Sequence, residues 1–387
     1  MKKTVTDICK ELIRIPSMSG CEKDIATDIG ELFQALGYDD VQFDRYGNVI
    51  GFVNGRAPGK TLLFDGHMDT VPVLDAEKWA HPPFAAEEQD GSIYGRGASD
   101  MKGALGAMIA AGARLAKDRD FSGRVAVAGV VHEECFEGVA SREISKNVQP
   151  DFVVIGEASN LEIACGQKGR AEICVETFGK SAHSANPQIG INAVLSMQRL
   201  IAEIERIPVT LHPKMGDGVL TLTDIKSSPY PGASVVPDYC KATYDRRILP
   251  GETKDEILKP IREVILRLSS QDAAFQAQVS ITHGEETCYT GAQITGERFF
   301  PAWILDEQDP YVQHAMQGIQ RAGMVPHVHY YSFCTNGSHY AGEANIKTIG
   351  FGPMTESMAH VRDERIEIKQ LQQASAAYFE IAKSVLQ

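Results

Sequence analysis

The sequence predicts an α/β fold with a largely parallel sheet, into which a smaller α+β domain is inserted. One observation is the alternation of apolar, strand-like runs with helical segments up to residue 155, because this alternation is typical of parallel sheets. The other is a strand–helix–strand–strand–helix–strand order after about residue 167. We therefore expect one domain from residues 1–167 and 288–387, and an inserted domain from residues 168–287.

Periodicity and composition place the individual elements. Helical periodicity indicates two helices at residues 5–15 and 23–37, and the alanine-rich segment 103–117 indicates a third. Residues 124–131 and 151–155 are almost continuously apolar, as expected of strands buried on both faces. The other elements expected in this domain are strands at 41–44, 48–53, 61–66 and 346–351 and helices at 139–147, 309–322 and 366–386. In the inserted domain we expect strands at 169–178, 218–228, 240–249 and 276–283 and helices at 190–205 and 253–269.

Charge and composition exclude several classes of function. The chain has 387 residues and a net charge of −13, which argues against nucleic acid or a membrane surface as the main partner. No run of about 18 apolar residues is present, so no membrane span is expected, and the first residues lack the apolar segment of a signal peptide. The eight cysteines form no Cys-x-x-Cys pair. We therefore expect a cytoplasmic protein with reduced thiols, Cys135 and Cys334 among the buried ones, and no thiolate zinc site.

The most informative motif, His67-Met68-Asp69, follows the apolar run 61–64. Side chains alternate along a strand, so the Asp69 carboxylate is expected on the same side as the His67 imidazole. It can then hold one ring nitrogen while the other nitrogen binds a metal. A histidine at a strand end is by itself more often a hydrogen-bonded core residue, so the motif needs support from other segments.

Asp100 and the Glu133-Glu134 pair supply that support. Asp100 stands in the glycine-rich segment 95–103, where it can be a helix N-cap or a carboxylate that bridges two metal ions. His132-Glu133-Glu134 follows the buried strand 124–131. On an extended backbone the two carboxylates point opposite ways, so one can bind metal while the other transfers protons.

Two further candidate ligands also come after predicted strands. Glu157 follows the strand 151–155, and His360 lies in the loop after the strand 346–351. Ligand sites in open α/β sheets lie beyond the carboxyl ends of the strands, so we expect all these side chains at one edge. The chain has no Gly-x-Ser-x-Gly, phosphate-binding Gly-x-x-x-x-Gly-Lys-Ser/Thr or His-Glu-x-x-His motif, and the pattern favours a metal hydrolase.

In this order the segments resemble the two-zinc amidohydrolase and exopeptidase family of acetylornithine deacetylase, succinyl-diaminopimelate desuccinylase, aminoacylase and carboxypeptidase G. Within that family they are most similar to the selenium-metabolism-linked hydrolases. The resemblance spans about residues 60–360. Its matching pieces are His67 to Pro72, Trp79 with Pro83-Phe84, Gly95 to Gly103, Glu133-Glu134, Gly156-Glu157, Gly179 to Ala193 and His360.

The resemblance implies a role for each matched residue. Asp69 orients His67, Glu133 is the general base, and the peptide bond between Asp100 and Met101 is cis. Asp100 bridges two metal ions. The implied ligands are His67 and Glu157 for one ion, Glu134 and His360 for the other, and Asp100 for both.

The inserted domain resembles the family's lid, which implies a homodimer formed through this domain. His183 is the implied oxyanion stabiliser, in its own or a partner's site, and Arg247 the implied partner of a substrate carboxylate. Without the resemblance, both would be ordinary surface residues. The remaining implied substrate contacts are Asn192, Thr335, Asn336, Gly337 and Ser338. Many relatives carry an aspartate in the loop 334–339, so their substrate preference cannot be transferred to this chain.

The resulting hypothesis is a hydrolase in which two divalent ions share a water. Zinc suits the mixed ligands, with cobalt or manganese as alternatives. Glu133 takes the water's proton, and the attack falls on an amide of a small N-acyl amino acid, dipeptide or ureido acid with a free carboxylate. The alternatives are a hydrolase with one metal and a non-catalytic protein that binds metal or an amino acid on the same fold.

Overall fold

The computed structural model describes residues 3–387, which divide into two compact units. The first unit comprises the chain up to Gln167 together with Glu285–Thr295 and Trp303–Gln387. The second comprises Lys168–Gly284 and Gly296–Ala302. The return to the first unit differs from the expected boundary at 288, because the short strand β19 (Phe299–Phe300) pairs with a strand of the second unit.

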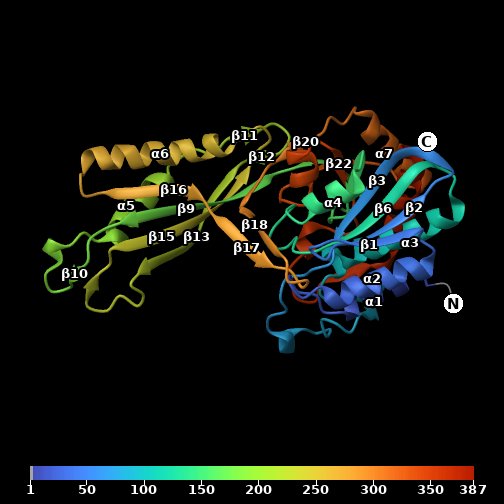
Figure 1. Ribbon diagram of the computed structural model, residues 1–387, viewed down its shortest axis with the longest axis horizontal. Helices are drawn as coiled ribbons and strands as arrows, with labels where there is room; N and C mark the ends of the chain where they lie inside the picture. The colour runs from blue at the N-terminus through green and yellow to red at the C-terminus, as the bar shows by residue number, and fades with distance from the viewer. Residues whose placement is uncertain (1–2) are drawn as a thin grey trace. The chain divides into compact units, whose positions relative to one another are not determined.

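A nine-stranded sheet forms the centre of the first unit (Figure 1). Its strand order is β1 (Asp40–Phe43), β2 (Val49–Asn54), β6 (Ser122–Val130), β3 (Ala57–His67), β7 (Phe152–Ile155), β22 (Lys347–Gly350), β8 (Ile163–Gln167) and β20 (Trp303–Ile304), with β21 (Val328–Tyr331) paired to β8. The central strands β6, β3, β7 and β22 run parallel to one another, whereas β1 and β2 are antiparallel additions. The predicted α/β fold with a largely parallel sheet is therefore confirmed.

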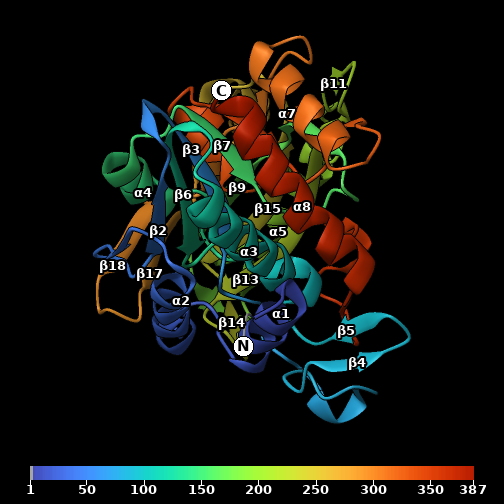
Figure 2. The same ribbon diagram turned by 90° about the vertical axis from the view of Figure 1, so that its right-hand side faces the viewer.

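Helices cover the sheet of the first unit. They are α1 (Val5–Arg14), α2 (Lys23–Leu36), α3 (Gly103–Asp118), α4 (Ser141–Val148), α7 (Pro310–Arg321) and α8 (Ile368–Val385). Figure 2 shows α2, α3 and α8 across one face of β2, β6 and β3. The small side chains of α3 allow close packing: a Cβ at Gly112 would lie 1.9 Å from the Tyr38 hydroxyl. A small separate sheet contains β4 (Glu87–Gln89), β5 (Ser92–Tyr94) and β23 (Arg365–Glu367).

The parallel strands end at one level. His67 of β3 pairs with Val130 of β6, and Ile155 of β7 pairs with both Asp65 and Gly350. The loops that leave these strands therefore begin side by side at one edge of the sheet. This register is what gathers residues far apart in the sequence.

The second unit is a five-stranded antiparallel sheet with two helices. The order of the four longer strands is β13 (Val219–Ser228), β15 (Tyr239–Ile248), β9 (Gly169–Phe178) and β16 (Gln276–Ile281), β19 pairs with β9, and the helices are α5 (Ala193–Ile204) and α6 (Lys254–Gln271). Apolar residues of both helices and of β9 and β15 form its core. Short strands β10 (Ala182–His183), β11 (Leu211–His212), β12 (Gly216–Asp217) and β14 (Val235–Val236) complete it. The predicted order of the six main elements is confirmed.

The hairpin of β17 (His283–Thr287) and β18 (Gln293–Glu297) begins and ends in the second unit, and its residues Glu285–Thr295 belong to the first. None of the helices in residues 3–387 combines the length and the apolarity that a membrane crossing requires.

Candidate metal centre

His67 is the last residue of β3, and its ring reaches two carboxylates. Its Nδ1 is 2.9 Å from the main-chain carbonyl of Asp69, which can only accept, so Nδ1 carries a proton. Nε2 faces Asp100 Oδ1 at 2.9 Å and Glu157 Oε1 at 3.4 Å. One imidazole nitrogen and two carboxylates therefore meet as a potential metal-binding group.

A second group contains Glu134, His360 and again Asp100. His360 Nε2 lies 3.0 Å from Glu134 Oε2 and 3.1 Å from Asp100 Oδ2. Asp100 thus presents Oδ1 to the first group and Oδ2 to the second, which is the arrangement that a bridging carboxylate needs. The Asp100–Met101 peptide is cis, as the resemblance implied. The N-cap of α3 is Lys102, so Asp100 is not the cap.

Asp69 contacts His67 differently from the expectation. The Asp69 carboxylate lies beside the His67 ring, 3.6 Å from Nδ1, but the hydrogen bond of Nδ1 goes to the Asp69 main-chain carbonyl. That carboxylate instead accepts hydrogen bonds from Ser19 Oγ at 2.7 Å and from the main-chain N–H groups of Glu133 and Glu134 at 3.1 and 3.2 Å. Asp69 orients the histidine through its carbonyl, and its carboxylate fixes the loop that carries both glutamates.

The loop after β6 is not extended, so the geometric reason for separating the two glutamates is wrong. β6 ends at Val130 and the following residues form turns. The two side chains still differ in environment: Glu134 joins a metal-binding group, whereas Glu133 joins neither group that contains Asp100. Oε1 of each is buried and finds no hydrogen-bond partner among residues 3–387.

The carboxylates and imidazoles of these two groups, with Glu133, form a cluster whose charges favour bound cations. Burial and the neighbouring Asp100 raise the pKa of Glu157 to about 8, and burial raises the pKa of Glu133 well above its ordinary value. Hydrogen bonds to Asp100 and Glu134 raise the pKa of His360 to about 10. If all four carboxyl groups are ionised, the cluster is negative even with both imidazole rings protonated, and bound cations would favour that ionised state. Buried carboxylates are costly unless paired or metal-bound, so the donor set fits divalent ions.

Glu364 is a supporting residue that sequence reasoning missed. Its side chain is fully buried, pairs with Arg96 Nη1 at 2.6 Å and accepts from the N–H groups of Gly97, Ser99 and Asp100 at 2.8–3.1 Å. It therefore holds the segment that presents Asp100. No motif marks it, because its partners are more than 260 residues away in the sequence.

Replacing Glu364 with alanine is expected to lower the free energy of unfolding by about 3–5 kcal/mol, because it leaves Arg96 as an unpaired buried charge. Urea denaturation followed by circular dichroism measures this. Glu367→Ala, at an exposed position on the same segment, is the control and is expected to change stability by less than about 0.5 kcal/mol. Equal losses in the two variants would contradict the role given to Glu364.

The other residues expected to bind substrate are divided between the second unit and the loop 335–338. His183, Asn192 and Arg247 belong to the second unit, where Asn192 caps α5 by accepting from Val194 and Leu195 N–H groups. In the loop 335–338, Thr335 donates to Gln167, and Asn336 links Asp65 with the Gly138 N–H. Thr335, Asn336 and Ser338 are buried. A direct substrate contact by any of these residues stays a prediction.

Comparisons with known proteins agree with this geometry. Residues 63–384 match the family model described as peptidase family M20/M25/M40. The chain is 32% identical to the uncharacterized protein YgeY of Escherichia coli K12 over 391 aligned positions, which cover 99% of this chain and 94% of that protein.

Solved structures share the fold at low identity. Aminopeptidase PepT of Bacillus cereus superposes with a TM-score of 0.77 at 18% identity, covering 99% of this chain and 98% of that one. The YXEP protein of Bacillus subtilis, described as a dinuclear metal-binding peptidase of the M20 family, superposes with a TM-score of 0.74 at 15% identity, covering 99% and 97%.

Proposed function

Because the chain belongs to the peptidase family M20/M25/M40, we propose that it hydrolyses an amide bond of a small substrate with a free carboxylate, using two divalent metal ions. The observation that carries the proposal is the placement of Asp100, with one carboxylate oxygen in each of two metal-binding groups. His67 and Glu157 would hold one ion and Glu134 and His360 the other, with Asp100 between them. Zinc is the proposed metal, and cobalt or manganese fit the same ligands.

The bound ions supply Lewis-acid activation of a water molecule and of the substrate carbonyl. Glu133 accepts the proton of the attacking water and then passes it to the departing amine. It is suited to this because it is buried beside both groups and belongs to neither. The Asp69 carboxylate holds the Glu133 main chain in place.

His183 is proposed as the donor that stabilises the oxyanion. The N–H of Ala185 donates to His183 Nδ1 at 3.0 Å. In the neutral ring the proton is therefore on Nε2, which is then available as a hydrogen-bond donor. This is the tautomer that oxyanion stabilisation requires.

Arg247 is proposed to bind the substrate carboxylate, and its neighbour Arg246 is not. Arg246 is buried and ion-paired with Glu252 at 2.7 Å, so its charge is already engaged. Arg247 pairs with Asp245 at 2.9 Å and keeps 30% of its side chain exposed. We further propose N-acyl amino acids, dipeptides or ureido acids as the substrate class, and a cytoplasmic homodimer formed through the second unit.

Metal removal tests the proposed function. Dialysis of the purified protein against a chelator is expected to abolish hydrolysis of N-acyl amino acids, dipeptides and ureido acids, and zinc, cobalt or manganese is expected to restore it. Titration of the restored activity should reach its maximum when Asp100 and its partners hold two ions. Full hydrolysis by metal-free protein would contradict the proposal, and saturation at one ion would favour a single-metal enzyme.

His183→Ala is expected to lower kcat by about 10²–10³-fold with little effect on KM, as loss of an oxyanion donor does. Steady-state kinetics measure the effect. Mixing this variant with Glu133→Gln subunits tests where His183 acts: recovered activity would place it in the partner's site. An unchanged kcat in His183→Ala would remove it from the mechanism.

A further inference from the structure

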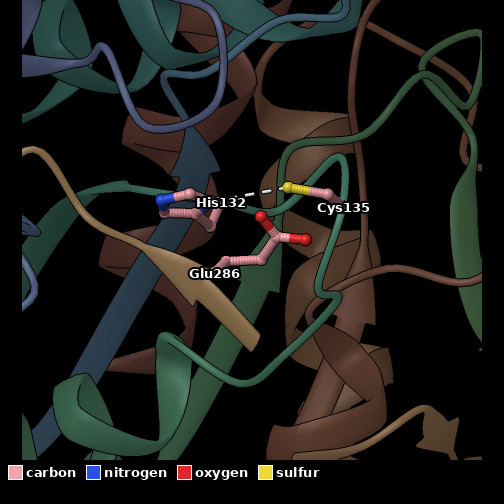
Figure 3. A group of neighbouring side chains, drawn as sticks. All are labelled: His132, Cys135 and Glu286. Atoms are coloured by element: carbon pink, nitrogen blue, oxygen red, sulfur yellow. Dashed lines mark hydrogen bonds between the residues drawn. The ribbon is translucent and has the colours of Figure 1, made fainter. Parts of the chain in front are cut away.

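Another cluster of metal-binding side chains lies on the loop after β6. A ring nitrogen of His132, Cys135 Sγ and a carboxylate oxygen of Glu286 are all within 4.8 Å of one another. Figure 3 shows the Glu286 carboxylate, which comes from β17, turned toward the other two side chains. None of the three residues belongs to the groups that share Asp100.

The hydrogen bonds of His132 prepare its ring for a metal. Nε2 lies 3.2 Å from the main-chain carbonyl of Thr287, and because a carbonyl oxygen only accepts, Nε2 carries the proton. In the neutral ring Nδ1 is then a lone pair, and it faces Cys135 Sγ at 3.4 Å. Metal-binding histidines have this arrangement, in which one nitrogen coordinates and the other donates to a carbonyl or carboxylate. Glu286 and Thr287 are adjacent in β17, so one strand supplies both a ligand and the acceptor.

The spacing also fits a tetrahedral ion. Zinc–nitrogen and zinc–sulfur bonds of about 2.0 and 2.3 Å put the two ligand atoms about 3.5 Å apart in a tetrahedral site. The separation of 3.4 Å between His132 Nδ1 and Cys135 Sγ matches this length. The carboxylate oxygen of Glu286, within 4.8 Å of the sulfur and of a His132 ring nitrogen, supplies a third ligand atom.

The histidine is held rigidly. His132 is 2% exposed, its main-chain N–H donates to Glu22 Oε1 at 3.2 Å, and its φ is 56°. A positive φ is uncommon for a residue other than glycine and marks a position that its surroundings over-determine. Cys135 is only partly buried, unlike the buried thiol expected from the sequence, so an ion can reach its sulfur from solvent.

We propose that His132, Cys135 and Glu286 form a third metal site, for a zinc-type divalent ion, separate from the pair of groups around Asp100. Binding releases the Cys135 thiol proton to solvent, and a water takes the fourth tetrahedral position. The loop between His132 and Cys135 carries Glu133 and Glu134. The ion therefore ties the catalytic loop to β17, which goes beyond the function proposed above.

Cobalt replacement tests the site, because of the three metal-binding groups within residues 3–387 this one alone contains sulfur. The full-length protein, stripped by a chelator and reloaded with Co²⁺, is expected to show thiolate-to-cobalt charge-transfer absorption in the near ultraviolet. Cys135→Ser is expected to lose this band and one equivalent of bound cobalt. Cys21→Ser, which removes the exposed thiol, is the matched control and should keep both.

No band in the parent protein, or a band that survives Cys135→Ser, overturns the proposal. The band reports sulfur ligation alone, so it is independent of how many ions the groups around Asp100 bind. Failure of the third site can thus be distinguished from failure of the proposed hydrolase function.

A second pair of variants covers the case in which Cys135→Ser does not fold. Glu286→Gln is expected to weaken cobalt binding at the sulfur site by at least about tenfold, whereas Glu285→Gln, its exposed neighbour on β17, leaves it unchanged. Zinc should also slow alkylation of Cys135 by iodoacetamide without slowing that of Cys21, measured by peptide mass spectrometry. Equal cobalt affinity in the two glutamine variants, or equal alkylation of Cys135 with and without zinc, overturns the site.

Discussion

Glu133→Gln is expected to lower kcat by about 10²–10⁴-fold, the usual contribution of a general base. Glutamine has the size of glutamate but cannot accept a proton, so chemistry is lost while the pocket keeps its shape. Because Glu133 belongs to neither group around Asp100, the variant should retain its metal ions, and KM should change little. Steady-state kinetics together with elemental analysis of bound metal measure both quantities.

The control for this variant is Glu143→Gln on α4. Glu143 makes ion pairs with Arg45 and Lys146, and its replacement removes the same charge without reaching the proposed site. It should keep kcat within about twofold, since such ion pairs have small energetic effects. Turnover of Glu133→Gln within about tenfold of the parent protein would show that another group takes the proton.

Asp100→Asn is expected to disrupt both metal positions at once. Each of its carboxylate oxygens faces a different histidine, at 2.9 and 3.1 Å, and asparagine offers one neutral oxygen in their place. We expect metal affinity to fall by more than the roughly 10–100-fold that loss of an outer-shell partner costs, and hydrolysis to fall with it. Equilibrium dialysis with zinc, followed by activity measurement, separates the two effects.

Asp65→Asn is the matched control, because Asp65 is also a buried aspartate near the strand edge. It accepts hydrogen bonds from Asn336 and Tyr340 and belongs to none of the metal-binding groups. This variant should still bind as many ions per chain as the parent protein. If Asp100→Asn also bound that number with unchanged affinity, Asp100 would not be a bridging ligand.

Most of the residues in the two groups around Asp100 could be predicted from the sequence, because they directly follow strands that the sequence also predicts. The buried strands β6 and β7 could be predicted from apolar runs, and Glu134 and Glu157 follow them directly. A parallel sheet places the carboxyl ends of its strands together. The position of His67 and His360 at this edge of the sheet could therefore be predicted too. The distances between their rings and the neighbouring carboxylates could not.

The sequence misplaced details that depend on loop conformation. The Asp69 carboxylate was expected to hold the His67 ring, but its hydrogen bonds come from Ser19 and from the main chain of Glu133 and Glu134. The contact of Asn336, in the loop 335–338, with Asp65 could not be predicted either. Turns after strands have no periodicity, so local patterns could not fix where these side chains point.

By itself the sequence determined the α/β fold, the order of elements in both units and the carboxylates and histidines at the strand ends, since hydrophobic periodicity is a local property of the chain. Only the tertiary structure decided that Asp100 lies between two histidines, that Glu364 supports it, and that Glu286 meets His132 and Cys135. These contacts join residues up to 264 positions apart, and they depend on sheet register and loop path, which no local pattern encodes.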